Sequence, residues 1–341
     1  MIKFTLPVAC VALGLAGCQG AGGARDQIRA VGSSTVYPFT TAVAEQFVRK
    51  HPGLKAPIVE STGTGSGMKL FCAGLGAQHP DVENASRRIK RSELEDCHKH
   101  GVTHIIEIQV GIDGIALAEN VRGPRFALSE ADIYKALAAH PFGRPNSART
   151  WRQVNPALPD VPIAVYGPPP TSGTRDAFAE LIMQKGCESD PAMKAITDKD
   201  RKQDICTRVR EDGAFIEAGE NDNLIVQKLS ANPAALGIFG YSFLEENKDR
   251  LNGVPLQGVE PSYESISSFA YPGARPLYIY VKGAHLNAVP GLKQFVAEYA
   301  RSWNPGGYLA RRGLIAAPAD VRARNLAIAT RLTPLDPATV E

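Results

Sequence analysis

The segment IRAVGSSTVYPF at residues 28–39 decides the fold, because it joins three structural signals in twelve residues. The apolar run Ile28–Val31 predicts a strand, and Gly32 with the three hydroxyl residues behind it predicts a turn. Pro38 then opens a stretch in which Phe39 and later apolar residues recur at helical spacing. The segment therefore predicts a strand, a turn and a helix in succession.

Two further segments repeat this layout. They are PIVESTGTGSGMK at residues 57–69 and VPIAVYGPPPTSGTRDAF at residues 161–178. Elsewhere, predicted strands at 81–85, 104–117, 237–239 and 277–281 alternate with predicted helices, among them one opened by a capping box at Ser92 and Glu95. Such alternation predicts an α/β protein, and 341 residues suffice for two domains.

The three turns share the chemistry of an anion site. Glycine lets the backbone come close to a ligand, unpaired N–H groups lie at each helix start, and hydroxyls add donors. The competing interpretation is that Ser and Thr are ordinary helix N-caps. Three such turns in one chain, each rich in hydroxyl residues and glycine, favour the anion site.

Two arginine positions support an anion ligand. Arg175 lies in the first turn of a predicted helix, where the helix dipole disfavours a cation unless an anion is bound, and Asp176 could hold it. Arg87 and Arg88 follow Ser86 at a strand end, and we expect one of them to turn inward and the other to be solvated. The alternative for all of them is plain surface charge.

Composition and motifs exclude several functions. A net charge of +3 is too balanced for a nucleic-acid-binding surface, and 7% aromatic residues do not suit a sugar-stacking groove. The chain has no nucleotide P-loop and no metalloprotease or nucleophile-elbow motif. Ser66-Gly67-Met68-Lys69 matches S-x-x-K, but the companion motifs of acyl-enzyme hydrolases are absent. We therefore expect no enzyme activity, no cofactor and no metal.

The N-terminus predicts export. Residues 1–17 have a positive start, a short apolar core and small residues before Cys18. Leu15-Ala16-Gly17-Cys18 resembles the bacterial lipobox, which implies that Cys18 becomes the first residue and carries lipid such as palmitate. Residues 18–25 would be the tether. An ordinary signal peptide with a chance cysteine is the alternative.

Cys10 leaves with the signal, and Cys18 is the expected anchor, so four cysteines remain. In an exported chain they predict two disulfides, for which three pairings exist. The local pairs Cys72–Cys97 and Cys187–Cys206 are favoured. A zinc site is the alternative, but no C-x-x-C spacing supports it.

An ordered set of motifs resembles the Pst-type phosphate-binding proteins, the exported components of phosphate ABC transporters. The set is GSSTVYPF at 32–39, GTGSGMK at 63–69, NASRR at 84–88, GIDGIA at 111–116 and TSGTRDAF at 171–178. The resemblance runs from about residue 27 to residue 330. It implies a two-lobed periplasmic-binding-protein fold of type II with the ligand in the cleft.

The resemblance also implies where the chain crosses between lobes. The first crossing is expected near residues 110–118 and the return near Tyr271–Val281. Residues 26–111 and 272–341 would form lobe one, and residues 112–271 lobe two. Each local cysteine pair then lies within one lobe.

The resemblance assigns the phosphate ligands position by position. They are Ser33, Ser34, Thr35, Val36, Thr64, Ser66, Ser86, Arg87, Ser172, Gly173, Thr174 and Arg175. Two departures affect this set, because many relatives have Asp where Arg87 stands, and some have an arginine where this chain has three prolines at 168–170. The group that accepts the proton of phosphate is therefore open, with Glu60, Asp113 and Asp176 as candidates.

The implied function is binding of inorganic phosphate outside the cytoplasmic membrane and delivery to an ABC transporter permease. We expect a lipid-anchored monomer of the cell envelope that binds no nucleic acid. The alternatives are a binding protein for sulfate or a small phosphorylated compound, and a surface lipoprotein or phosphate-ester hydrolase on the same fold.

Overall fold

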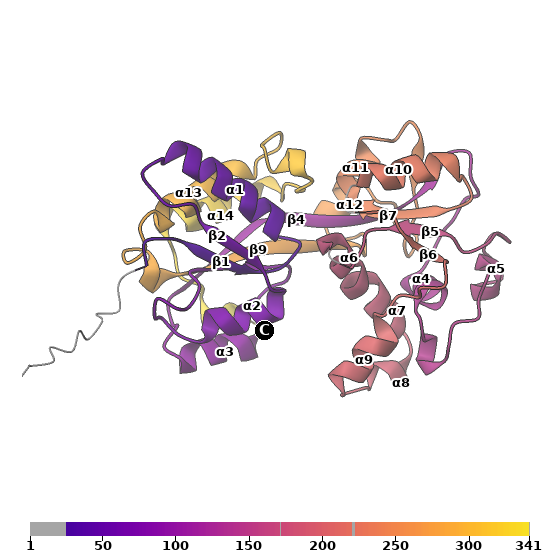
Figure 1. Ribbon diagram of the computed structural model, residues 1–341, viewed down its shortest axis with the longest axis horizontal. Helices are drawn as coiled ribbons and strands as arrows, with labels where there is room; N and C mark the ends of the chain where they lie inside the picture. The colour runs from indigo at the N-terminus through magenta and orange to yellow at the C-terminus, as the bar shows by residue number, and fades with distance from the viewer. Residues whose placement is uncertain (1–24, 171, 220–221, 341) are drawn as a thin grey trace, which may run out of the picture.

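The protein is described from a computed structural model that covers residues 25–170, 172–219 and 222–340 (Figure 1). The predicted signal, Cys18 and nearly all of the tether lie outside these residues. The strands are β1 Arg29–Gly32, β2 Ile58–Ser61, β3 Val82–Ala85, β4 Ile105–Asn120, β5 Val165–Gly167, β6 Phe215–Glu217, β7 Leu236–Gly240, β8 Leu251–Gly253 and β9 Ala274–Lys282. The principal helices are α1 Tyr37–Lys50, α2 Thr64–Cys72, α3 Arg91–Lys99, α4 Glu130–Leu137, α6 Gly173–Phe178, α7 Gln184–Glu188, α9 Lys199–Cys206, α10 Asp222–Ala231, α13 Leu292–Ser302 and α14 Ala319–Arg331.

Short helices complete the chain. They are α5 Trp151–Val154, α8 Pro191–Lys194, α11 Tyr241–Glu245, α12 Tyr263–Ser267 and the 3₁₀ turns Pro141–Gly143, Gly283–His285, Ala310–Arg312 and Pro337–Thr339. A π-helical segment, Ala179–Met183, joins α6 to α7 without a break. The third predicted turn, before α6, therefore leads into a continuous helical stretch that ends at residue 188.

The strands follow the order β2-β1-β3-β9-β4-β7-β5-β6, with β8 beside β4. The first lobe contains β1, β2, β3, β9 and the start of β4, and the second lobe contains the end of β4 with β5 to β8. Figure 1 shows β4 passing from one lobe to the other. β9 pairs antiparallel with β4 from Ile105 to Gly114, and the register shifts between Gln109 and Gly111. The boundaries at residues 111/112 and 271/272 stay a prediction.

Apolar faces place helices on both sides of the first lobe's sheet. α1 buries Phe39, Val43 and Phe47 against residues of α13 in one core. α2 and α3 bury Met68 and Leu94 in a second core on the other face. The second lobe has one large core. This layering holds the ends of β1, β2 and β3, where the predicted donor turns lie.

Both predicted disulfides are confirmed. Cys72–Cys97 joins α2 to α3, and Cys187–Cys206 joins α7 to α9. In the chain-entropy model, loops of this size stabilise the fold by about 3 kcal/mol each. Each bond lies inside one lobe, so neither restrains the movement of one lobe against the other.

One local prediction was wrong. The helix expected to open with a capping box at Ser92 begins at Arg91, because the Glu93 carboxylate accepts the N–H of Lys90 and makes Lys90 the N-cap. The two apolar runs at 104–110 and 112–117 form the single strand β4, since strand pairing continues across them on both lobes.

Candidate functional site

Loop one, residues Gly32–Val36, connects β1 to α1. Gly32 has φ +126°, and a Cβ there would overlap the carbonyl oxygen of Asn84 and lie 2.7 Å from Oε1 of Glu83. The buried Ser33 hydroxyl accepts the N–H groups of Thr35 at 3.2 Å and Val36 at 3.4 Å. Ser33 therefore shapes the start of α1 from within.

Loop two, residues Thr62–Ser66, lies beside loop one at the start of α2. Gly67, in the first turn of α2, packs on Gly32, since a Cβ on Gly67 would lie 2.6 Å from the Gly32 Cα. Thr64 is buried, and its Oγ1 accepts the N–H of Ser86 at 3.1 Å and lies 3.1 Å from the Ser86 hydroxyl. Ser66 is exposed. The structure thus brings three of the predicted donors, Thr64, Ser66 and Ser86, next to loop one.

Loop three, residues Ser172–Thr174, meets loop one across the gap between the lobes. The Thr35 hydroxyl donates to the Gly173 carbonyl at 3.0 Å, and the Ser34 hydroxyl donates to Oδ2 of Asp176 at 2.5 Å. A Cβ on Gly173 would lie 2.6 Å from the Thr35 N atom, so glycine permits this approach. Ser172 caps α6 by accepting the N–H of Thr174 at 3.2 Å.

Arg275 of β9 lies where the two lobes meet and was not among the predicted ligands. Its guanidinium donates to Thr35 Oγ1 at 2.6 Å, to Glu180 Oε2 at 2.7 Å and to Asp113 Oδ2 at 3.3 Å. The residue is only 4% exposed. These three partners belong to loop one, to the π segment of the second lobe and to β4. Arg275 therefore places a fixed positive charge beside the loops. The sequence feature that could have indicated it is its position between Pro272 and Pro276 in the predicted return strand.

The predicted arginines have other partners. Arg87 makes a bidentate pair with Glu93, at 2.9 and 2.8 Å, and this carboxylate raises the Arg87 pKa. Arg88 is paired in the same way with Glu107. Each of Arg87 and Arg88 thus has a carboxylate of its own, while their side chains stay 34% and 37% exposed.

Arg175 turns toward its own lobe. Its guanidinium stacks 4.3 Å from the Phe215 ring centroid and donates to the Pro168 carbonyl at 3.1 Å. Burial lowers the pKa of Arg175, although the charges of Glu217 and Asp176 oppose this. The structure does not bring Arg175 into contact with loop one.

The candidate carboxylates are dispersed. Glu60 pairs with Arg29 at 2.6 Å on the edge of the sheet. Asp113 lies against Arg275, and burial raises its pKa although the guanidinium opposes this. Asp176 binds Ser34. A further carboxyl, Glu83, is fully buried and was missed because the sequence of β3 does not show that both faces of this strand are covered.

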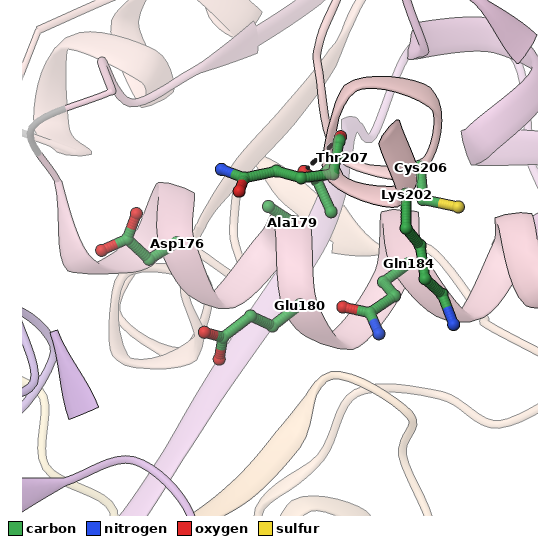
Figure 2. Close-up of a pocket in the computed structure, with 8 residues that line it drawn as sticks. Asp176, Ala179, Glu180, Gln184, Lys202, Cys206 and Thr207 are labelled. Carbon is green, nitrogen blue, oxygen red and sulfur yellow. Dashed lines mark hydrogen bonds between the residues drawn. The ribbon is translucent and has the colours of Figure 1, made fainter. Parts of the chain in front are cut away.

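A polar groove of about 400 Å³ adjoins the contact between the lobes. It is lined by Asp176, Ala179, Glu180, Gln184, Lys202, Gln203, Cys206 and Thr207. Figure 2 shows Asp176 and Glu180 extending from one helical stretch, with Gln184 beside Lys202 further along the groove. Carboxylates, amides and an ammonium group can bind a polar molecule, and Asp176 and Glu180 belong to both the groove and the contact.

Two lobes joined by a strand pair, with donor loops meeting between them, define a binding protein of the periplasmic type. The PBP superfamily domain matches residues 19–302. Protein SphX of Synechococcus elongatus is 35% identical over 81% of this chain and 74% of its own length. The phosphate-binding protein PstS of Staphylococcus saprophyticus is 30% identical over 83% of this chain and 80% of its own.

A solved structure gives the same result. The crystal structure of a possible phosphate binding protein from Planctomyces limnophilus superposes with a TM-score of 0.72 at 31% identity, covering 89% of this chain and 98% of that one. The chain belongs to the PBP superfamily, in the family that includes the phosphate-binding protein PstS and the protein SphX. The predicted resemblance and the α/β binding-protein fold are confirmed. No helix of the described residues is long and apolar enough to cross a membrane.

Proposed function

We propose that this chain binds inorganic phosphate between its lobes and delivers it to the permease of an ABC transporter. The observation that carries the proposal is the meeting of loop one and loop three beside Arg275. A phosphate ion stripped of water needs many donors in exchange, and charge-assisted hydrogen bonds contribute about 1.5–3 kcal/mol each. Hydroxyls and backbone N–H groups from both lobes, with one fixed guanidinium, meet this need.

Delivery requires that a bound and an unbound form differ. Among the described residues, the lobes share only β4 and β9 as crossing strands, and the register shift between Gln109 and Gly111 is a natural place for bending. We propose that closure about this strand pair buries the ion and makes the form that the permease recognises. Lipid attachment at Cys18 would hold the protein on the outer side of a bacterial membrane near that permease.

Calorimetry on phosphate-stripped protein tests the function. We expect phosphate to bind with a dissociation constant in the micromolar range or below. Sulfate, which carries no proton at neutral pH, should bind at least about tenfold more weakly beside the carboxylates of Asp113 and Asp176. Heat with sulfate and none with phosphate would identify a different oxyanion carrier.

The groove of Figure 2 favours a second candidate, a small phosphorylated compound whose polar part would lie against Gln184 and Lys202. Competition between phosphate and glycerol phosphate decides between the two. A lower dissociation constant for glycerol phosphate than for phosphate would favour this candidate. Because binding involves no bond cleavage, we expect no release of glycerol from the ester.

A further inference from the structure

Glu83 is a fully buried carboxyl inside the first lobe. It lies on β3, opposite Val31 of β1 and Tyr280 of β9, and its exposed fraction is 0%. Neither Oε1 nor Oε2 has a hydrogen-bond partner among the described residues. An ionised carboxylate that is buried without hydrogen-bond partners destabilises the fold. Glu83 is therefore either protonated or retained for a role other than stability.

The carboxyl lies between the two donor loops of the first lobe. A Cβ on Gly32 would lie 2.7 Å from Oε1 of Glu83, and a Cβ on Gly67 would overlap Oε2. Gly32 begins loop one, and Gly67 lies in the first turn of the helix that follows loop two. Glu83 therefore lies directly behind both sets of anion donors.

The charges around Glu83 do not neutralise it. Arg87 is the cation that acts on it, but Arg87 is already held by both oxygens of Glu93. The Glu93 carboxylate itself adds repulsion, and the nearby Tyr280 hydroxyl is engaged by Glu107 and Ile89. Burial is the largest cause that raises the pKa of Glu83 well above its usual range, and Glu93 adds to it. All of these effects favour the neutral acid.

We propose that Glu83 keeps its proton when the site holds an anion, and that ionisation of Glu83 switches the site off. A negative carboxylate behind loops one and two would repel an anion on their donors. Anion binding is then linked to one proton held by the protein. This inference rests on the proposed function.

The test compares the full chain with Glu83→Gln, which is neutral at every pH and nearly isosteric. Phosphate affinity is measured by calorimetry from about pH 6 to about pH 10. We expect equal affinities at the acidic end. Above the titration of Glu83, the unmodified protein should lose affinity relative to the variant by about tenfold per pH unit, because it must take up a proton to bind. The ratio cancels the titration of phosphate itself.

The control is Glu45→Gln, a surface carboxyl of helix α1 in the same lobe that is paired with Arg312. It should follow the unmodified protein at every pH. A constant ratio between Glu83→Gln and the unmodified protein over the whole range overturns the proposal, because a purely structural role would shift all points equally. Glu83→Ala, neutral and smaller, serves if Glu83→Gln does not fold.

A ligand-free measurement separates this inference from the proposed function. If no form of the protein binds phosphate, the function fails, and Glu83 is then judged by stability. A carboxyl with a raised pKa in the folded state supports folding fully at low pH and loses that contribution as pH rises. From about pH 4.5 upward, the unfolding equilibrium constant of the unmodified protein should therefore grow about tenfold per pH unit relative to Glu83→Gln, until the folded group titrates. A stability difference that does not change with pH shows that Glu83 does not hold its proton, and the inference is then wrong.

Discussion

Arg275 and Arg175 show how differently a buried and a half-buried guanidinium group can be used near one cleft. Arg275 comes from a crossing strand and touches both lobes through Thr35 and Glu180. Arg175 comes from the first turn of α6, yet it stacks on Phe215 of its own lobe and donates to Pro168. A place at a helix N-terminus near a cleft does not by itself make an arginine a ligand contact, because the side chain follows the nearest ring and carbonyl. The charge at the cleft comes from a strand instead.

The largest expected effect is that of Arg275→Ala. Its loss leaves the mostly buried Asp113 without its cation, and breaking a buried pair costs about 3–5 kcal/mol. We expect a clear loss of thermal stability and a loss of phosphate affinity of at least about a hundredfold, the equivalent of about 2.7 kcal/mol. Denaturation and calorimetry measure the two. Arg275→Lys, which keeps the charge, should recover part of the stability; full phosphate affinity in Arg275→Ala would remove this residue from the site.

Arg175→Ala should have a smaller effect. The change removes a cation–π contact worth about 0.5–2 kcal/mol and one carbonyl hydrogen bond within the second lobe. We expect a modest decrease in stability and less than about a tenfold loss of phosphate affinity, acting through the position of loop three. Equal losses of phosphate affinity in Arg175→Ala and Arg275→Ala, measured in the same titration, would contradict this difference between the two arginines.

Glu180→Gln should have the smallest effect and the opposite sign on binding. The Glu180 side chain is 59% exposed, so its pair with Arg275 contributes little to stability, less than about 1 kcal/mol. Removing its charge frees Arg275 for the ligand. We expect phosphate affinity to rise about two- to fivefold in calorimetry at low salt. Lower affinity would show that Glu180 helps closure more than it competes with the anion.

The sequence predicted those features that depend on neighbouring residues. Loop one, the start of α1 and the capping Ser172 follow from local patterns of glycine, hydroxyl and apolar residues. Arg275 could not be found in this way, since its contact with Thr35 spans 240 residues of chain and forms only when β9 returns beside β4. The capping box lies at Lys90 and not at Ser92, because the Glu93 carboxylate accepts the N–H of Lys90 and also pairs with Arg87.

Glu83 illustrates a different limit. All four residues of β3 are buried, and the sequence alone does not show that a strand carrying Glu83 and Asn84 has no exposed face. The two glycines that make room for its oxygens stand 51 residues before it and 16 residues before it in the chain, in turns whose glycines already had an explanation as anion donors. The packing of Gly67 on Gly32 in the folded chain shows that these glycines also leave room for the Glu83 carboxyl.

The pairing of β4 with β9 has a consequence for how this architecture can change. The chain leaves the first lobe on β4 and comes back on β9, with Asp113 directly opposite Arg275. The second lobe is thus an insertion whose two ends are hydrogen-bonded neighbours, while both described chain ends belong to the first lobe. A different second lobe could be spliced at this point without altering the order of β1, β2 and β3. Loops one and two would keep their geometry, and the new lobe would need only a partner for Thr35 and for Arg275.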